Sequence, residues 1–329
     1  MQSKKFILKL IIFSLFNLAI MASLLLFFSG QNRDIRLKNW ETESNLLVAG
    51  ENEHYDIAIL GTSRGRVFSR DSNHLTMENI LEKRVINLSK GGGGGLLPAK
   101  VHLAHFYRRG NKADHVIYFV DPWIFFCPIN NENNTFFLRD EPFETSILFD
   151  LIINRFPSER IISYIQMIAV DDWKKISKYA APGLDRLTLK AIDPVKLEEA
   201  RNHYLGLYDY DKFEHYSKFL YDINGLAKEH NSRITYIMLP ILMRDFPGAK
   251  EVDEKLRAIT GKNINGENFI NRELSGKTLV HKGTGDKKDI GYYNLIDEMQ
   301  DRQFFYDHMH FNNRGVAHFT KTYLEPILK

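Results

Sequence analysis

The chain has 329 residues and a formal net charge of +3, with 44% hydrophobic and 26% charged residues. This length can bury a sizeable core and accommodates either two average domains or one large α/β domain with insertions. The small net charge, and the lack of a basic stripe interleaved with aromatic residues, argue against a nucleic-acid-binding protein. The single cysteine, Cys127, excludes an internal disulfide and fits either redox compartment.

The amino terminus is the one strongly non-globular segment. Residues 10–28 contain no charged side chain and follow three lysines. At about 1.5 Å per helical residue they span roughly 29 Å, close to the thickness of the hydrocarbon core. The pattern predicts a transmembrane helix, and hence a membrane anchor over residues 1–30. A cleaved signal peptide is the alternative, but Phe28 spoils the small-x-small cleavage site that would end at Gly30.

A polar and charged segment, residues 31–54, follows the predicted anchor and indicates a tether or a first amphipathic helix. Its basic residues Arg33, Arg36 and Lys38 match the three preceding lysines in number. The positive-inside rule therefore does not decide on which side of the membrane the body lies.

The body, predicted over residues 55–329, alternates strands with helices. Such alternation predicts the α/β class, with a central parallel sheet covered on both faces. From about 127 to 210 the pattern changes to an Asn-rich loop and mixed helical stretches, which indicates an inserted helical region or cap. The predicted strands are 56–60, 84–88, 115–120 and 233–240. The predicted helices are 98–109 and 211–229, the second opened by a capping box at "DKFE". A last helix is predicted after Asn312 or Asn313, either of which can cap it.

Three residues in two distant segments form a candidate catalytic set. Ser63 follows the first strand and precedes a predicted helix, where its hydroxyl is open and its N–H lies at a helix start, as suits a nucleophile. Asp307 and His310 are three residues apart, so one turn brings them together as an orienting carboxylate and a base. The alternatives are a helix cap at Ser63, a structural His310, or a metal site at "DHMH". No second ligand cluster supports a metal, and we expect neither metal nor cofactor.

Four ordered blocks carry a family resemblance: "AILGTSRG", "NLSKGGGG", "VIYFVDPW" and "YDHMHFNNRGVAHF". They resemble the SGNH/GDSL hydrolase superfamily, and more narrowly its membrane-anchored cell-envelope branch, which includes D-alanyl transfer and alginate O-acetylation proteins. The resemblance covers about residues 56–126 and 233–328. It implies a three-layer, flavodoxin-like fold. It also implies a catalytic body on the periplasmic or extracellular side of the cytoplasmic membrane, an envelope glycan as acceptor, and a membrane-embedded acyl-transfer partner.

The resemblance also implies residue roles. Ser63 corresponds to the nucleophile, His310 to the general base and Asp307 to its orienting partner. The oxyanion hole is expected to use the N–H of Ser63 together with that of Gly91 or Gly92, within the run of five glycines from 91 to 95.

The sequence departs from the family pattern at two places. Gly-Thr-Ser replaces Gly-Asp-Ser, and Asp121 lies where the family offers an asparagine to the oxyanion hole. An ionised carboxylate would repel an oxyanion. Asp121 is therefore expected to hold Arg64 or a sugar hydroxyl, or the hole to be built from backbone N–H groups alone. Arg64, Asp121 and Trp123 are the candidate substrate-binding residues.

The predicted function is that of a membrane-tethered serine acyltransferase or esterase acting on O-acyl groups, foremost O-acetyl groups, of a cell-envelope polysaccharide. The alternative is a catalytically silent domain that binds a polysaccharide or membrane assembly through the "DPWIFF" loop, unless those aromatic side chains simply pack in the core. A nucleotide site at the glycine run is the weakest hypothesis, because a Walker loop needs Gly-Lys-Ser/Thr at the helix entry and Leu-Leu-Pro follows here.

Overall fold

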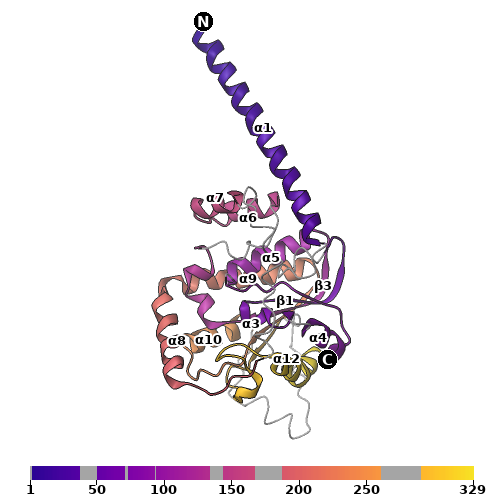
Figure 1. Ribbon diagram of the computed structural model, residues 1–329, viewed down its shortest axis with the longest axis vertical. Coiled ribbons are helices and arrows are strands. Elements are labelled where there is room, and N and C mark those ends of the chain that lie inside the picture. The colour runs from indigo at the N-terminus through magenta and orange to yellow at the C-terminus, as the bar shows by residue number, and fades with distance from the viewer. Residues whose placement is uncertain are drawn as a thin grey trace. The chain divides into compact units, whose positions relative to one another are not determined.

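The computed structural model divides the chain into two units, residues 1–48 with 138–180 and residues 49–137 with 181–329 (Figure 1). Much of the predicted tether, residues 38–49, and the helical stretch expected after residue 166 lie outside the described residues. The structure describes residues 2–37, 50–70, 73–92, 94–133, 144–166, 187–260 and 290–329.

The first unit contains one long apolar helix, α1 (Gln2–Leu37). Its stretch Lys4–Phe27 has a mean hydropathy of 2.5 and is long and apolar enough to cross a membrane, a test that a signal sequence also passes. The predicted N-terminal apolar helix is therefore confirmed, and it continues seven residues past residue 30. The same unit holds α6 (Thr145–Ile153) and α7 (Ser158–Gln166).

The second unit is built on a parallel five-stranded sheet with the strand order β2-β1-β3-β4-β5. The predicted α/β class with a central parallel sheet is thus confirmed, and the four predicted strands are present. The strands are β1 (His54–Leu60), β2 (Val85–Asn87), β3 (Lys112–Val120), β4 (Arg233–Met238) and β5 (Ile290–Asn294).

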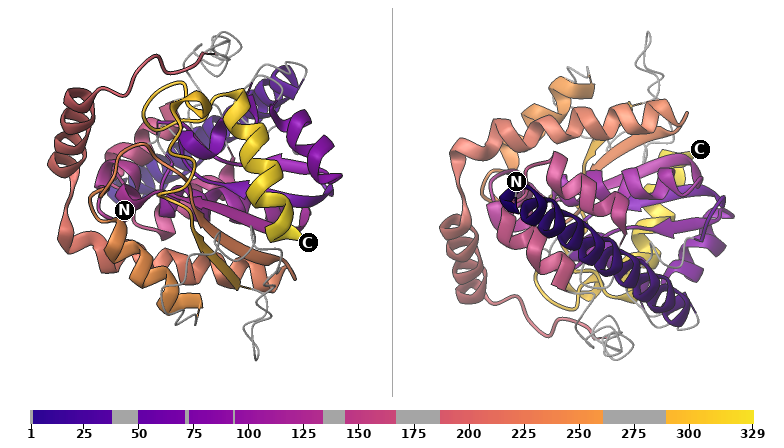
Figure 2. Two further views of the ribbon diagram at one scale, coloured as in Figure 1. Left: turned by 90° about the horizontal axis from the view of Figure 1, so that it is seen from below. Right: turned by 90° about the horizontal axis from the view of Figure 1, so that it is seen from above.

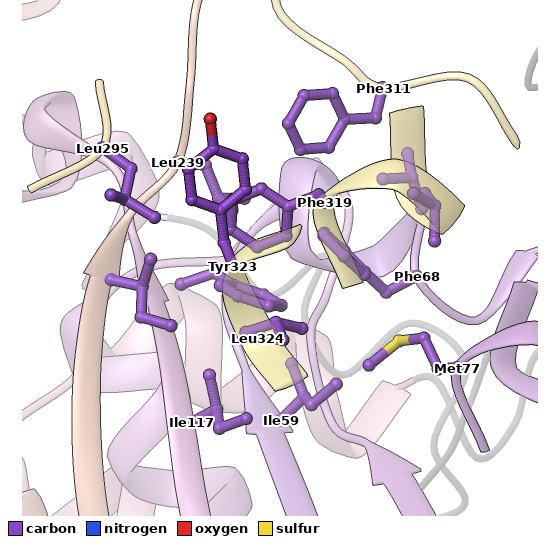
Figure 3. Packing of buried hydrophobic residues seen from close by; sticks show 14 of the residues in the cluster. Ile59, Phe68, Met77, Ile117, Leu239, Leu295, Phe311, Phe319, Tyr323 and Leu324 are labelled. Atoms are coloured by element: carbon purple, nitrogen blue, oxygen red, sulfur yellow. The ribbon is translucent and has the colours of Figure 1, made fainter. Parts of the chain in front are cut away.

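Helices cover both faces of this sheet (Figure 2). Ile59 of β1 is paired with Ile117 of β3 across the sheet. Because successive side chains of a strand point to opposite faces, these two paired residues lie on the same face. There they pack in a core with Phe319 and Leu324 near the C-terminus (Figure 3). The helices of the second unit are α3 (Ser63–Arg66), α4 (Asn73–Leu81), α5 (Leu96–Arg108), α8 (Pro194–Leu207), α9 (Phe213–Glu229), α10 (Ala249–Thr260), α12 (Asn313–Phe319) and α13 (Glu325–Leu328), with a π-helical turn η8 (Thr320–Leu324) between the last two.

Tyrosines of the central strands contact the helices of the opposite face. The Tyr118 hydroxyl of β3 donates to the Gly95 carbonyl at the start of α5, at 3.1 Å. The Tyr236 hydroxyl of β4 donates to Asn224 Oδ1 of α9, at 2.6 Å. The residue alternation of the strands thus places α5 and α9 on one face and α4 and α12 on the other.

Two helix starts differ from the sequence prediction. Helix α5 begins at Leu96, two residues earlier than predicted, because Gly95 is its N-cap and the Leu97 N–H finds an acceptor in Asn131 Oδ1 at 3.1 Å. The capping box predicted at "DKFE" is wrong. Asp209 instead accepts from the Asp211 N–H at 3.1 Å and caps a short 3₁₀ turn, so that α9 begins at Phe213.

The cap of the last long helix is confirmed at Asn312, whose Oδ1 accepts from the Gly315 N–H at 2.9 Å. This bond fixes where α12 begins, and with it the end of the loop that carries His310. The remaining short turns are the 3₁₀ segments η2 (Pro122–Phe125), η3 (Pro128–Asn130), η6 (Tyr210–Lys212) and η7 (Arg302–Phe304).

The expected insertion 127–210 is divided between the two units. Its returning arm, which includes α8, belongs to the sheet-bearing unit. The Arg201 guanidinium of α8 donates to the carbonyls of Arg244 and Asp245 at 2.7 and 3.0 Å, beyond the carboxyl end of β4. The arm is therefore bound to the edge of the sheet at which the candidate site lies.

Candidate active site

The nucleophile candidate lies in the tight turn between β1 and α3. Ser63 is the first residue of α3, and the preceding Thr62 is the N-cap, whose Oγ1 accepts from the Arg64 N–H at 3.3 Å. The alternative in which Ser63 caps this helix is therefore wrong. Because Thr62 serves as the cap, the Ser63 hydroxyl remains available for another partner.

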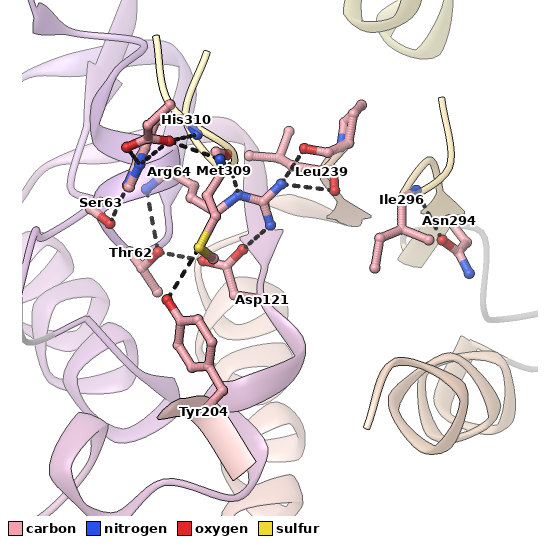
Figure 4. A network of polar contacts seen from close by, with 12 residues as sticks. Thr62, Ser63, Arg64, Asp121, Tyr204, Leu239, Asn294, Ile296, Met309 and His310 are labelled. Carbon is pink, nitrogen blue, oxygen red and sulfur yellow. Dashed lines mark hydrogen bonds and ion pairs between the residues drawn. The ribbon is translucent and has the colours of Figure 1, made fainter. Parts of the chain in front are cut away.

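The three predicted catalytic residues form a continuous hydrogen-bonded line (Figure 4). Ser63 Oγ lies 2.8 Å from His310 Nε2. On the other side of the ring, His310 Nδ1 lies 2.8 Å from Asp307 Oδ2 and 3.1 Å from Oδ1. A carboxylate at Nδ1 favours the tautomer with the proton on that nitrogen, which leaves Nε2 as an acceptor for the serine proton.

A tight turn holds the carboxylate and the imidazole together. Asp307 Oδ1 accepts from the N–H groups of Met309 and His310 at 2.8 and 2.7 Å. Burial raises the pKa of Asp307, but the hydrogen bond from His310 and the two amides outweigh it and hold that pKa below its ordinary value. Asp307 therefore stays ionised, and the imidazole keeps its orienting partner.

Arg64, a candidate for substrate binding, is committed to protein partners. Its Nε donates to the Met309 carbonyl at 3.0 Å, and one Nη donates to Asp121 Oδ1 at 2.6 Å. The other Nη donates to the carbonyls of Leu239, at 2.9 Å, and Pro240. The residue is only 2% exposed. The expectation that Arg64 binds substrate is not supported, since the side chain is buried and each of its three nitrogens already donates to a protein acceptor.

Asp121 holds Arg64, one of the two roles expected for it. The Thr62 hydroxyl donates to its Oδ2, the oxygen that Arg64 leaves free. Full burial raises the pKa of Asp121, and the Arg64 guanidinium and the Thr62 hydroxyl oppose that rise. Both carboxylate oxygens are thus occupied, which argues against the alternative role of binding a sugar hydroxyl.

The third candidate for substrate binding, Trp123, is buried as well. Its ring centroid lies 4.9 Å from that of Tyr204 on α8 and 5.4 Å from that of Phe246. Phe125 and Phe126 of the same "DPWIFF" segment are also buried. The segment therefore packs in the core, and the expectation that it offers a contact surface is wrong.

The glycine run passes close to the nucleophile turn. A Cβ at Gly94 would lie 2.5 Å from the Lys90 carbonyl oxygen and 2.7 Å from the Thr62 Cα. Gly92 has a φ of +73°, in the left-handed region that favours glycine. Among the described residues, the N–H groups of Ser63, Gly91 and Gly92 have no hydrogen-bond partner. The residues expected to form an oxyanion hole thus have donors to offer.

Asparagines that the sequence analysis assigned no role support this loop. Asn130 Nδ2 donates to the Gly94 carbonyl at 3.2 Å, and Asn131 accepts from the Leu97 N–H. Asn87, at the end of β2, donates to the Gly65 carbonyl in α3 at 2.9 Å. The asparagine-rich loop after the third strand was the available signal for Asn130 and Asn131.

Tyr204 also reaches the site, and nothing in its sequence surroundings indicates this. Its hydroxyl lies 3.3 Å from Met309 Sδ, next to His310. The two residues are 105 positions apart in the chain, and Tyr204 belongs to the returning arm of the expected insertion. Only the fold brings α8 to the triad.

The alternative of a metal site at "DHMH" is not supported. His308 Nε2 lies 3.2 Å from the Asp193 N–H, while His310 faces Ser63 and Asp307. Within the described residues, no three His, Cys, Asp or Glu side chains are grouped so that they could hold a metal ion. The two histidines of the motif thus serve different contacts.

Comparison with known proteins adds no relative: no family profile matches the chain, and no curated protein sequence matches it.

Proposed function

We propose that this protein is a membrane-tethered serine acyltransferase or esterase that acts on O-acyl groups, foremost O-acetyl groups, of a cell-envelope polysaccharide. The observation that carries the proposal is the line from Ser63 Oγ to His310 Nε2 and from His310 Nδ1 to Asp307, with 2.8 Å at each step. Nucleophile, base and orienting carboxylate are the three roles that serine acyl transfer needs.

The reaction begins when Ser63 Oγ attacks the acyl carbonyl carbon and His310 Nε2 takes the hydroxyl proton. The tetrahedral intermediate collapses, the bond to the leaving alcohol breaks, and His310 returns the proton to that alcohol. An acyl ester on Ser63 remains. A sugar hydroxyl or water then attacks this ester while His310 removes its proton, and the acyl group leaves Ser63, which regains its proton.

Backbone N–H groups are proposed to stabilise the oxyanion. The donors are the amides of Ser63 and of Gly91 or Gly92, which are without partners in the described part of the chain. Asp121 supplies no donor, because its carboxylate is engaged by Arg64 and Thr62. Removing one oxyanion donor costs about 10²-fold or more in rate, so the glycine loop has to supply what an asparagine side chain would.

The substrate class and the location follow from the sequence resemblance. The block order and the strand-end positions of Ser63 and Asp121 support a three-layer, flavodoxin-like SGNH fold. The apolar stretch of α1 supports an anchor that keeps the body beside the outer face of the cytoplasmic membrane. There an envelope glycan would be the acceptor, and a membrane-embedded partner protein would deliver the acyl group.

The competing hypothesis, a catalytically silent binding domain, relied on the "DPWIFF" segment as its contact surface. The "DPWIFF" segment is buried, whereas the three catalytic candidates lie within hydrogen-bond distance of one another. An ordered triad beside a glycine loop favours catalysis.

Separate Ser63→Ala and His310→Ala substitutions test the proposal. Each is expected to lower acyl transfer to, or acyl removal from, an O-acetylated glycan by about 10⁴-fold or more, because a triad works as a unit. Tyr221→Ala, an exposed position on α9, is the matched control and should keep full activity. Folded variants with unchanged glycan acylation would support the silent binding domain instead.

A further inference from the structure

We propose that the buried Arg64–Asp121 ion pair is a positioning device that holds the general base His310 against the nucleophile. This inference rests on the proposed serine chemistry. In this role Arg64 and Asp121 neither bind substrate nor contribute to the oxyanion hole. Arg64 acts on His310 through the carbonyl of Met309, the residue before it, to which its side chain donates. Asp121 acts through Arg64, whose guanidinium it holds.

Arg64 joins the two halves of the catalytic set directly. It follows Ser63 in the chain, and its Nε donates a hydrogen bond to the Met309 carbonyl at 3.0 Å. One residue therefore spans from the peptide bearing the nucleophile to the peptide bearing the base. A shift of the guanidinium moves the turn 307–310 relative to Ser63, and the 2.8 Å contact between Oγ and Nε2 depends on that turn.

The same guanidinium is fixed from the sheet. It donates to the carbonyls of Leu239 and Pro240, where the chain leaves β4, and to Asp121, just beyond the end of β3. Donors in a rigid planar fork define both the position and the plane of the group. A lysine ammonium in its place would keep the charge but lose this fork.

Asp121 fixes the orientation of Arg64 and neutralises its charge. Its second oxygen accepts from the Thr62 hydroxyl, so the carboxylate is held from the nucleophile turn as well. Both side chains of the pair are almost completely buried. A buried charge left without its partner is costly, and neither residue can be replaced alone without disturbing the other.

Other contacts keep the turn folded when the pair is altered. The Leu242 N–H donates to the His308 carbonyl at 3.1 Å, and Tyr204 contacts Met309 Sδ. The Tyr306 ring is stacked on that of His310, with 5.3 Å between centroids. A weakened ion pair should therefore displace His310 rather than unfold the site.

The test compares Arg64→Lys, Asp121→Asn and the double variant with wild type. The control is Arg257→Lys, which alters an ion pair to Asp253 at 2.7 Å within α10. We expect each single variant to lower kcat for ester hydrolysis by about 10- to 100-fold, as for a base displaced by about 1 Å, with KM within about threefold. The double variant should lose little more than either single one, because the residues act as one unit.

A spectroscopic readout separates positioning from general loss of structure. In wild type the His310 Nδ1 proton, held by Asp307, should give a strongly downfield proton NMR signal. Arg64→Lys should shift or broaden it while the thermal unfolding midpoint stays within a few degrees of the Arg257→Lys control. Arg64→Met combined with Asp121→Asn, which leaves no unpaired buried charge, provides the same readout if Arg64→Lys does not fold.

Two results would overturn the inference. One is a variant with wild-type kcat and an unchanged downfield proton. The other is loss of activity that follows only the loss of folded protein. If wild type itself formed no acyl-enzyme, the proposed function would fail, but the downfield proton would still decide whether Arg64 positions His310.

Discussion

Neighbouring residues at the end of β1 have separate duties. Thr62 caps α3, Ser63 faces His310, and Arg64 turns inward to Asp121. This division explains how Asp121 is accommodated next to the proposed oxyanion hole. Its carboxylate binds the Arg64 guanidinium and the Thr62 hydroxyl, so it does not face a developing oxyanion as a free anion.

Asp307→Asn should lower kcat by about 10⁴-fold while KM changes little, because the amide favours the wrong imidazole tautomer and no longer stabilises the imidazolium. The measurement is steady-state hydrolysis of an activated acetyl ester. Glu325→Gln, a variant of the carboxylate that pairs with Lys329 at the C-terminus, is the control and should behave as wild type. Equal kcat in both variants would remove Asp307 from the catalytic set.

The lowered pKa of Asp307 makes a stability prediction with a definite sign. A carboxylate whose folded-state pKa is below its unfolded value contributes stability above the unfolded pKa and loses it as the pH falls through the folded pKa. The melting temperature of wild type should therefore exceed that of Asp307→Asn at pH 7, and the gap should shrink as the pH falls below about 4. The effect is expected to be small, since the side chain is 44% exposed. A gap that grew in acid would contradict the ionised Asp307.

At the residue scale, the sequence predicted the members of the triad because block order and a D-x-x-H spacing put them at strand and helix ends. It did not predict that Arg64 is buried. The motif shows only that an arginine follows the serine. Whether that arginine faces solvent or the ends of β3 and β4 depends on groups far away in the chain, the Asp121 carboxylate 57 residues on and the Met309 carbonyl 245 residues on.

At the element scale, the glycine loop has little room for added atoms at Gly94. Gly94→Ala places a methyl group against the backbone of Lys90 and Thr62. Overpacking of this kind is expected to lower the free energy of unfolding by about 1–3 kcal/mol. Gly94→Ala should also slow acylation of Ser63, because Thr62 precedes it.

Gly91 and Gly92 tolerate an added methyl group better than Gly94 does. Gly92→Ala meets no atom within 4 Å but keeps a φ of +73°, at a cost of about 1–2 kcal/mol. Gly91→Ala meets only the end of the flexible Arg66 side chain. Gly225→Ala, in the middle of α9 with open space, is the control and should be neutral or slightly stabilising. Equal melting temperatures and acylation rates in all four variants would reduce the run to an ordinary loop.

Four of the five described strands were predicted from the sequence, and the edge strand β5 was not. The strands β1 to β4 carry apolar runs because helices cover both faces. The edge strand β5 is only half-buried, and its sequence "IGYYN" contains a glycine and no such run, so it was missed. The capping box at "DKFE" failed because Asp209 competes as a cap two residues earlier.

At the scale of the whole molecule, α1 is the proposed membrane anchor. We expect the helix to be retained in the membrane uncleaved, because Phe28 spoils the cleavage site that would end at Gly30. Two charges at its centre, Leu15→Arg with Leu18→Arg, each cost about 3 kcal/mol of insertion free energy, so the double variant should be lost from carbonate-washed membranes. Phe6→Arg, beside the N-terminal lysines, is the control and should be retained. A mature protein whose mass lacks the first 30 residues would show instead a cleaved signal sequence.

Whether Ser63 is the nucleophile is decided by the site of the acyl group on the trapped protein. The full chain is mixed with an activated acetyl ester, quenched in acid within the first turnovers, digested, and sequenced by mass spectrometry. We expect one acetyl group on Ser63 in wild type, and none in Ser63→Ala or His310→Ala. Folded wild type that carries no acetyl group, or carries it on another residue, would contradict it.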